Sequence, residues 1–166
     1  MATALLPDNL PTSVATQQLG QAYGCAPALL LAEWLSAKAC KPLVIITETV
    51  SSAETLTRQL HYFLGGSDAV ALLRDPETLP YDRFSPHQDL ISHRLKVMSE
   101  LAQRQLKALV IASPTLFYRL PPADYIRAHG ITLKQSERIT LEQFQLRLET
   151  SGYERVSQVN NHGEYA

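Results

Sequence analysis

Three apolar runs, free of polar interruptions, recur along the first two thirds of the chain. They cover residues 43–46, 69–73 and 108–112. A strand with one wet face alternates apolar and polar positions, whereas a strand covered on both faces is apolar throughout. The pattern therefore predicts three strands of a parallel sheet whose two faces are both covered.

Segments with helical spacing separate these runs. Residues 27–39 are mostly Ala and Leu and include Trp34. A capping-box pattern from Ser51 to Glu54 predicts the start of a second helix, with Leu56, Leu60 and Leu64 on one stripe. Residues 89–103 predict a third helix with its own apolar stripe, formed by Ile91, Leu95, Met98 and Ala102. Helices that alternate with buried strands predict a doubly wound α/β layer with right-handed crossovers.

The pattern changes after a short helix capped at Ser113 and a break at two prolines. Residues 125–130 predict a turn, and 131–134 alternate like a strand with one wet face. Thr140 opens a further capping box, and Gly152 is expected to end that helix, whose inward positions are Leu141, Phe144 and Leu148. Val156 and Val159 indicate another strand. We expect a first domain over 1–128 and the beginning of a second over 129–166, with the chain ending inside that domain or in a disordered tail.

Composition narrows the functional classes. The 166 residues are 45% apolar and carry 15 basic against 16 acidic side chains, for a net charge of −1. A near-zero charge argues against a stand-alone DNA-binding protein, so the arginines at 83, 94, 119 and 127 are interpreted as a solvated surface. Cys25 and Cys40 flank one predicted helix and are expected to be reduced. No apolar run approaches the length of a membrane span, and we expect a cytoplasmic protein without a membrane partner.

The segment before the first helix has the outline of a phosphate-binding loop. A functional loop reads Gly-x-x-x-x-Gly-Lys-[Ser/Thr], because backbone amides hold the phosphates, the lysine neutralises them and the hydroxyl binds magnesium. Here the corresponding positions run from Gln21 through Gly24 to Pro27 and Ala28. Proline has no N–H and alanine has no oxygen. The loop is either an ordinary helix start, with Pro27 at the first helical position, or a phosphate loop without cation or metal ligand; neither binds a cofactor.

Residues 77–94 hold the densest group of chemically versatile side chains. His87, Asp89 and His93 are all residue types that bind metals, but a helix N-cap explains Asp89 better. A serine hydrolase centred on Ser85 lacks the glycine-flanked nucleophile turn. Asp75 ends the second strand as a magnesium-binding acid would, although it has no second acid beside it. We therefore predict no catalytic residue and no metal site.

The same segment closely resembles the bacterial transcription-repair coupling factors. The resemblance is carried by Glu77-Thr-Leu-Pro-Tyr-Asp, Phe84-Ser-Pro-His-Gln-Asp and, near the end, Ser151-Gly-Tyr and His162-Gly-Glu-Tyr-Ala. It covers nearly the whole chain apart from the first dozen residues.

This resemblance implies an N-terminal module similar to the excision-repair helicase UvrB, with a RecA-like first domain and a small second domain. UvrB has a complete phosphate loop where this chain has Gln21 to Ala28, and a DNA-clamping hairpin where this chain has only the short connection 81–88. The resemblance thus implies that the module lacks ATP chemistry and the DNA clamp. In the family, ATP hydrolysis and contacts with RNA polymerase and DNA belong to later domains.

The resemblance also implies a partner. The family's N-terminal module recruits the damage-recognition subunit UvrA and is masked in the resting protein by contact with the C-terminal region. The family's UvrA contacts fall beyond Ala166, so no UvrA-binding residue is assigned. Two other functions remain open: an active ATP-dependent DNA translocase domain, and a DNA-binding module.

Overall fold

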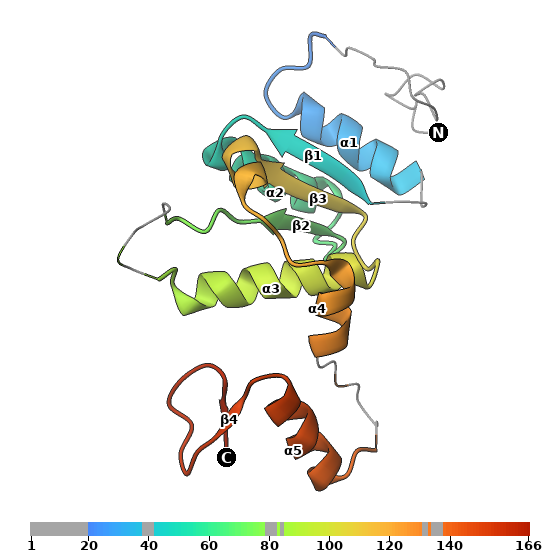
Figure 1. Cartoon of the computed structure of the whole chain (residues 1–166). Helices are drawn as coiled ribbons and strands as arrows, with labels where there is room; N and C mark the ends of the chain where they lie inside the picture. The colour runs from blue at the N-terminus through green and yellow to red at the C-terminus, as the bar shows by residue number, and fades with distance from the viewer. Residues whose placement is uncertain (1–19, 38–41, 79–82, 84, 131–132, 134–137) are drawn as a thin grey trace.

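A parallel three-stranded sheet forms the centre of the larger unit (Figure 1). The computed structural model describes residues 20–37, 42–78, 83, 85–130, 133 and 138–166. The strands are β1 (Leu43–Thr47), β2 (Val70–Leu73) and β3 (Ala108–Ala112), in the spatial order β1-β3-β2. Helices flank both faces, so the predicted doubly wound α/β layer is confirmed, and it is consistent with a RecA-like fold.

The strand order explains why helices cover both faces. Helix α2 (Val50–Phe63) connects β1 to β2 across the position of β3, and α3 (Gln88–Ala102) then leads back from β2 to β3. Because parallel crossovers are right-handed, two crossovers in opposite directions place their helices on opposite faces. Helix α1 (Ala26–Ala37) packs beside α2, and α3 lies on the other side of the sheet (Figure 1).

Two apolar clusters fill the spaces between these layers. Ala108, Val110 and Ala112 of β3 pack with residues of α1 and α2, while Leu109 and Ile111 of β3 pack with α3. All five β3 residues are buried. The alternation of side chains along a strand thus supplies both clusters from one central strand.

Strand β1 differs from the prediction of two covered faces. Leu43 and Ile45 pack against the α1–α2 cluster, but Val44 and Ile46 are 54% and 57% exposed. These two residues lie beside Leu109 and Ile111 of β3, on the face that carries α3. Within the described residues α3 packs over β2 and β3, and the apolar side chains of β1 on that face remain uncovered.

The starts of α2 and α3 also differ from the predictions. Thr49, not Ser51, is the N-cap of α2, and its hydroxyl oxygen accepts a hydrogen bond from the Ser52 amide at 3.1 Å. At α3 the N-cap is His87, which leaves Asp89 in the first turn of the helix. A carboxylate in the first turn still interacts favourably with the helix dipole. Asp89 therefore does mark the start of the helix, although the N-cap lies two residues earlier.

The segment after β3 holds one element that the sequence pattern did not predict. The short 3₁₀ helix η1 (Ser113–Phe117) follows β3 with Pro114 in its first turn, but its N-cap is Ala112 and not the predicted Ser113, and no side chain caps it. The predicted turn over 125–130 instead belongs to helix α4 (Ala123–His129). The Arg127 guanidinium donates to the Ala102 carbonyl oxygen at 2.8 Å and so fixes α4 to the end of α3.

A smaller unit at the C-terminal end contains α5 (Leu141–Thr150) and two short parallel strands, β4 (Glu154–Arg155) and β5 (Glu164–Tyr165). Thr140 caps α5 as predicted. At the other end Gly152 has a φ of 86°, the Gly152 amide donates to Glu149 and the Tyr153 amide to Leu148. These two bonds form a Schellman motif, for which glycine is the favoured residue.

Several other predictions for this unit differ from the structure. Leu148 is buried, but Leu141 is 72% exposed, and Val156 and Val159 lie outside the strands. Most of the strand predicted over 131–134 lies outside the described residues. The domain boundary between residues 128 and 129 stays a prediction.

The carboxylate of Glu164 closes the turn between β4 and β5. It accepts hydrogen bonds from the Asn160 and Asn161 amides at 2.7 and 2.9 Å and from the Asn161 side chain at 2.8 Å. These bonds, with the Asn161 side chain contributing most, lower the pKa of Glu164. The turn holds Tyr165 in place. The Tyr165 hydroxyl donates to the Glu149 carboxylate of α5 at 2.8 Å.

Truncation of a valine to alanine is expected to lower the free energy of unfolding by different amounts on the two faces of the sheet. Val110→Ala removes two methyl groups from a fully buried site and is expected to lower the free energy of unfolding by about 2 kcal/mol. Val44→Ala is the matched control and is expected to cost less than about 0.5 kcal/mol, because its side chain is already half exposed. Urea unfolding followed by circular dichroism measures both; equal losses would contradict the described packing.

Candidate functional site

The loop before α1 has two backbone positions in the left-handed region, as tight phosphate loops do. Gln21 has a φ of 62° and Gly24 a φ of 60°, and both residues are exposed. A β-carbon added at Gly24 meets nothing within 4 Å. Glycine is therefore favoured there by backbone conformation and not by the close approach of another group. Cys25, next to it, is a free and exposed thiol, whereas Cys40 lies outside the described residues.

Three of the first four residues of α1 have no backbone amide available to an anion. The Ala26 amide donates to the Tyr23 carbonyl oxygen at 3.1 Å, and the Leu29 amide donates to that of Cys25 at 3.1 Å. Pro27 has no N–H to donate. Three of the four positions that open α1 thus offer no free donor, although free amides are what makes a helix N-terminus attractive to phosphate.

The position that a magnesium-binding hydroxyl would occupy faces the protein core. Ala28 is 0% exposed and packs in the cluster formed by α1, α2 and the sheet. Pro27, predicted as the first helical residue, is the second, because α1 begins at Ala26. Neither residue carries a charge or an oxygen on its side chain.

A shallow hollow of about 320 Å³ lies beside this loop and is lined without a charged side chain. Gly24 and Pro27 form one side, and Thr47 and the start of α2 form the other. Two of its hydroxyls already have partners: that of Thr47 donates to the Thr49 carbonyl oxygen at 3.0 Å, and that of Ser52 accepts from the Thr49 hydroxyl at 2.9 Å. A polyphosphate placed in this hollow would meet no cation.

Asp75, at the carboxyl end of β2, is held by protein donors. One carboxylate oxygen accepts the Glu77 amide at 2.9 Å, and the other accepts the Thr115 hydroxyl at 3.0 Å. Thr115 is 1% exposed and belongs to η1, which follows β3. The carboxylate therefore ties the ends of two adjacent strands together, and we call Asp75 and Thr115 the strand-end bracket.

Arg94 extends the strand-end bracket to α3. Its guanidinium donates to the Arg74 carbonyl oxygen, next to Asp75. Burial lowers the pKa of Arg94, while the nearby Asp75 acts in the opposite direction. On the other side, the Tyr118 hydroxyl donates to the Thr78 carbonyl oxygen at 2.8 Å. The first part of the segment 77–94 is thus fixed to the carboxyl edge of the sheet.

The three residues weighed as metal ligands do not converge. His87 and Asp89 are exposed at the start of α3, where the His87 ring nitrogen Nδ1 accepts from the Asp89 amide at 3.3 Å. His93 lines a separate groove between α2 and α3. Among the described residues, no group of three or more metal-binding side chains is close enough to hold an ion. Tyr81, Asp82 and Phe84, which carry part of the family resemblance, lie outside those residues.

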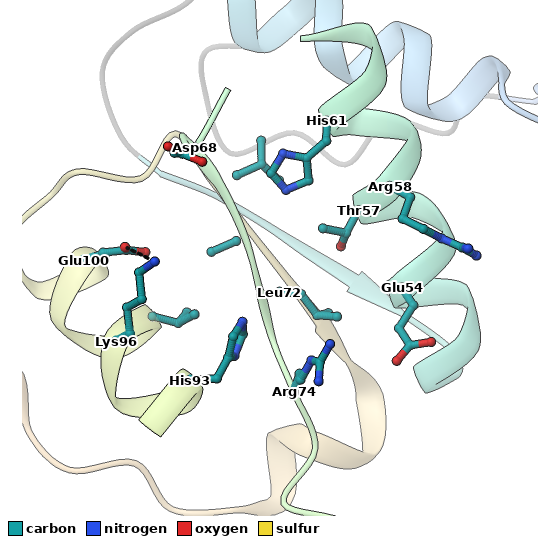
Figure 2. Close-up of a pocket in the computed structure, with 13 residues that line it drawn as sticks. Glu54, Thr57, Arg58, His61, Asp68, Leu72, Arg74, His93, Lys96 and Glu100 are labelled. Atoms are coloured by element: carbon teal, nitrogen blue, oxygen red, sulfur yellow. Dashed lines mark ion pairs between the residues drawn. The ribbon is translucent and has the colours of Figure 1, made fainter. Parts of the chain in front are cut away.

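A further hollow, beside the sheet, was not predicted from the sequence. It is a groove of about 550 Å³ between α2 and α3, along the edge of β2 (Figure 2). We call it the β2-edge groove. Its charged lining includes Glu54, Arg58, Arg74, Lys96 and Glu100. The polar residues of α2 and α3 have helical spacing in the sequence. Only the strand order shows that these residues of the two helices flank β2.

His93 is the titratable side chain most affected by this environment. Burial lowers its pKa, and the positive charges of Arg74 and Lys96 lower it further. Its Nδ1 atom is buried and has no hydrogen-bond partner among the described residues. The imidazole is therefore neutral at neutral pH, and its neutral form suits a site next to two cations.

No helix of the described residues is long and apolar enough to cross a membrane.

The chain is similar to several bacterial transcription-repair-coupling factors, although no protein-family model matches it. It is 36% identical over 159 residues to the transcription-repair-coupling factor of Escherichia coli (strain K12), covering 95% of this chain. The corresponding factor of Haemophilus influenzae is 36% identical over 100% of the chain, and that of Staphylococcus aureus (strain USA300) 28% identical over 90%. The chain spans about 14% of the length of these relatives.

The strand-end bracket predicts that removal of the half-buried Asp75 carboxylate destabilises the protein. Asp75→Ala leaves the buried Thr115 hydroxyl and the Glu77 amide without their acceptor and is expected to lower the free energy of unfolding by about 1–3 kcal/mol. Asp75→Asn keeps one acceptor oxygen and is expected to cost less. Asp68→Ala, an exposed acid just before β2, is the control. Urea unfolding measures all three; a D75A loss no larger than that of D68A would contradict the bracket.

Proposed function

Since the chain belongs to the transcription-repair-coupling factor family, we propose that it is a non-catalytic module of such a protein in the bacterial cytoplasm. In the parent protein the module helps to recruit UvrA to RNA polymerase stalled at DNA damage, and so contributes to nucleotide excision repair. It also takes part in autoinhibition through contact with the C-terminal region. RNA polymerase and DNA bind to other domains of the parent, which is an ATP-dependent DNA translocase.

The observation that carries the non-catalytic role is the state of the α1 loop. Its backbone retains the left-handed turns at Gln21 and Gly24. The Ala26 and Leu29 amides are hydrogen-bonded within the chain, Pro27 has no N–H, and Ala28 packs into the core. A loop that keeps these backbone turns but offers no cation supports a vestigial phosphate site in a fold that now serves as a scaffold.

Asp75, at the carboxyl end of β2, supports the same proposal. A metal-binding acid at a strand end needs oxygen lone pairs that face open space. Both Asp75 oxygens accept bonds from protein groups, and Thr115 is buried against one of them. The carboxylate therefore serves the stability of the carboxyl edge of the sheet.

Binding of magnesium ATP tests the non-catalytic role. The chain is expected to show no saturable binding of a fluorescent ATP analogue up to about 1 mM, where a functional phosphate loop binds far below that concentration. Gly24→Ala is expected to leave this result unchanged. Saturable binding in the micromolar range that is lost in G24A would mean that the domain is an active nucleotide-binding unit.

Recruitment of UvrA is tested by comparing two lengths of the parent protein. The 166-residue chain is expected to bind UvrA weakly or not at all, because the family's UvrA contacts follow Ala166. A longer segment that completes the second domain is expected to bind at least about tenfold more tightly, a difference of about 1.4 kcal/mol. Isothermal titration calorimetry measures both, and equal affinity would contradict this part of the proposal.

A further inference from the structure

His93 is a polar residue in the stripe of α3 that packs on the sheet. The buried residues of α3 are Leu90 and Val97, and Val97 packs in the same apolar cluster as Leu73 of β2. His93 follows Leu90 by three positions and precedes Val97 by four. Residues with these spacings share one face of a helix. An imidazole therefore lies where α3 meets the sheet, in a stripe that is otherwise apolar.

The buried nitrogen of this imidazole has no partner. Its Nδ1 atom is buried and makes no hydrogen bond among the described residues. In a neutral imidazole one nitrogen can be a bare acceptor, whereas a protonated imidazole carries an N–H on both nitrogens. Protonation of His93 would thus bury a charged donor without an acceptor, which costs more than burying a bare acceptor. The position suits the neutral ring alone.

The charges around His93 also oppose its protonation. Figure 2 shows Arg74 and Lys96 on either side of the ring. Burial lowers the pKa of His93 most, both cations lower it further, and only Glu100, which lies 3.8 Å from Lys96, acts in the opposite direction. The other charged or titratable side chains that line the groove are Glu54, Arg58 and His61 of α2 and Asp68, just before β2.

We propose that His93 is a proton-sensitive contact that holds the N-terminal half of α3 on the sheet at neutral pH and releases it at mildly acidic pH. The groove is open to solvent, so a protonated ring can leave the packed stripe for water. Arg94, the next residue, is bonded to the Arg74 carbonyl oxygen, and this bond is expected to loosen with the same half of the helix. The C-terminal half of α3 keeps its apolar contacts through Met98 and Leu101. This contact is separate from the α1 loop and does not depend on the UvrA proposal.

Urea unfolding of the complete chain at pH 7.5 and pH 5.5 tests the link between protonation and folding. An imidazole in an unfolded chain has a pKa of about 6.5. Because folding lowers the pKa of His93, the unfolded chain binds the proton more tightly, and stability falls as the pH falls below about 6.5. One such proton reduces the ratio of folded to unfolded chain by at most about tenfold over this pH range. We expect this ratio to fall about threefold to tenfold further in the unaltered chain than in His93→Gln.

His61→Gln is the matched control, because His61 lines the same groove from α2. It is expected to keep the pH dependence of the unaltered chain. Circular dichroism establishes that each variant is folded. Arg74→Gln removes one of the two cations beside the ring and is expected to raise the pH at which His93 titrates.

NMR titration gives a second measurement that does not need the His93→Gln variant to fold. In the unaltered chain the His93 ring signals are expected to titrate at a lower pH than those of the exposed His87 and His162. The backbone amide signals of residues 90–94 are expected to change together with the ring.

Three results would overturn the proposal. The first is the same loss of stability at pH 5.5 in His93→Gln and in the unaltered chain. The second is a His93 ring that titrates together with the exposed histidines. The third is a change of amide signals on protonation of His93 that leaves the N-terminal half of α3 unaffected.

Discussion

The structure depends on the requirement that β3 be covered from both faces. It is the strand to which both β1 and β2 are hydrogen-bonded, and all five of its side chains are buried. Ala108, Val110 and Ala112 require α1 and α2 on one face, and Leu109 and Ile111 require α3 on the other. The strand then runs directly into η1, which carries Thr115 to the Asp75 carboxylate. Core packing and the geometry of the carboxyl edge are therefore set by the same short segment.

The layer arrangement was predictable because uninterrupted apolar runs and helical stripes are local properties of a sequence. The exposure of Val44 and Ile46 was not predictable in this way. An apolar residue in the sequence shows that a side chain can be buried, but it does not show whether another element covers it. The helix starts were misplaced for a related reason. Ser51 and Thr49 both have the chemistry of a cap, and the choice between them follows from where β1 ends.

The candidate site shows the same limit more clearly. The residue types of the α1 loop could be judged from the sequence, because a missing lysine and a missing hydroxyl are visible there. The role of Asp75 could not, since its partner Thr115 lies 40 residues further along the chain. The β2-edge groove joins side chains from two helices and one strand, and only the strand order brings them together.

The order β1-β3-β2 also has a consequence for how the chain folds during synthesis. β1 and β2 do not pair with each other, so neither has a ladder partner until residues 108–112 have left the ribosome. Before that moment α1, α2 and α3 have only each other and unpaired strands to pack against. The three-stranded sheet can therefore form only after β3 has been synthesised. A pause in translation shortly before Ala108 would prolong the exposure of the unpaired β1 and β2 edges. Unpaired strand edges make a nascent chain prone to aggregate.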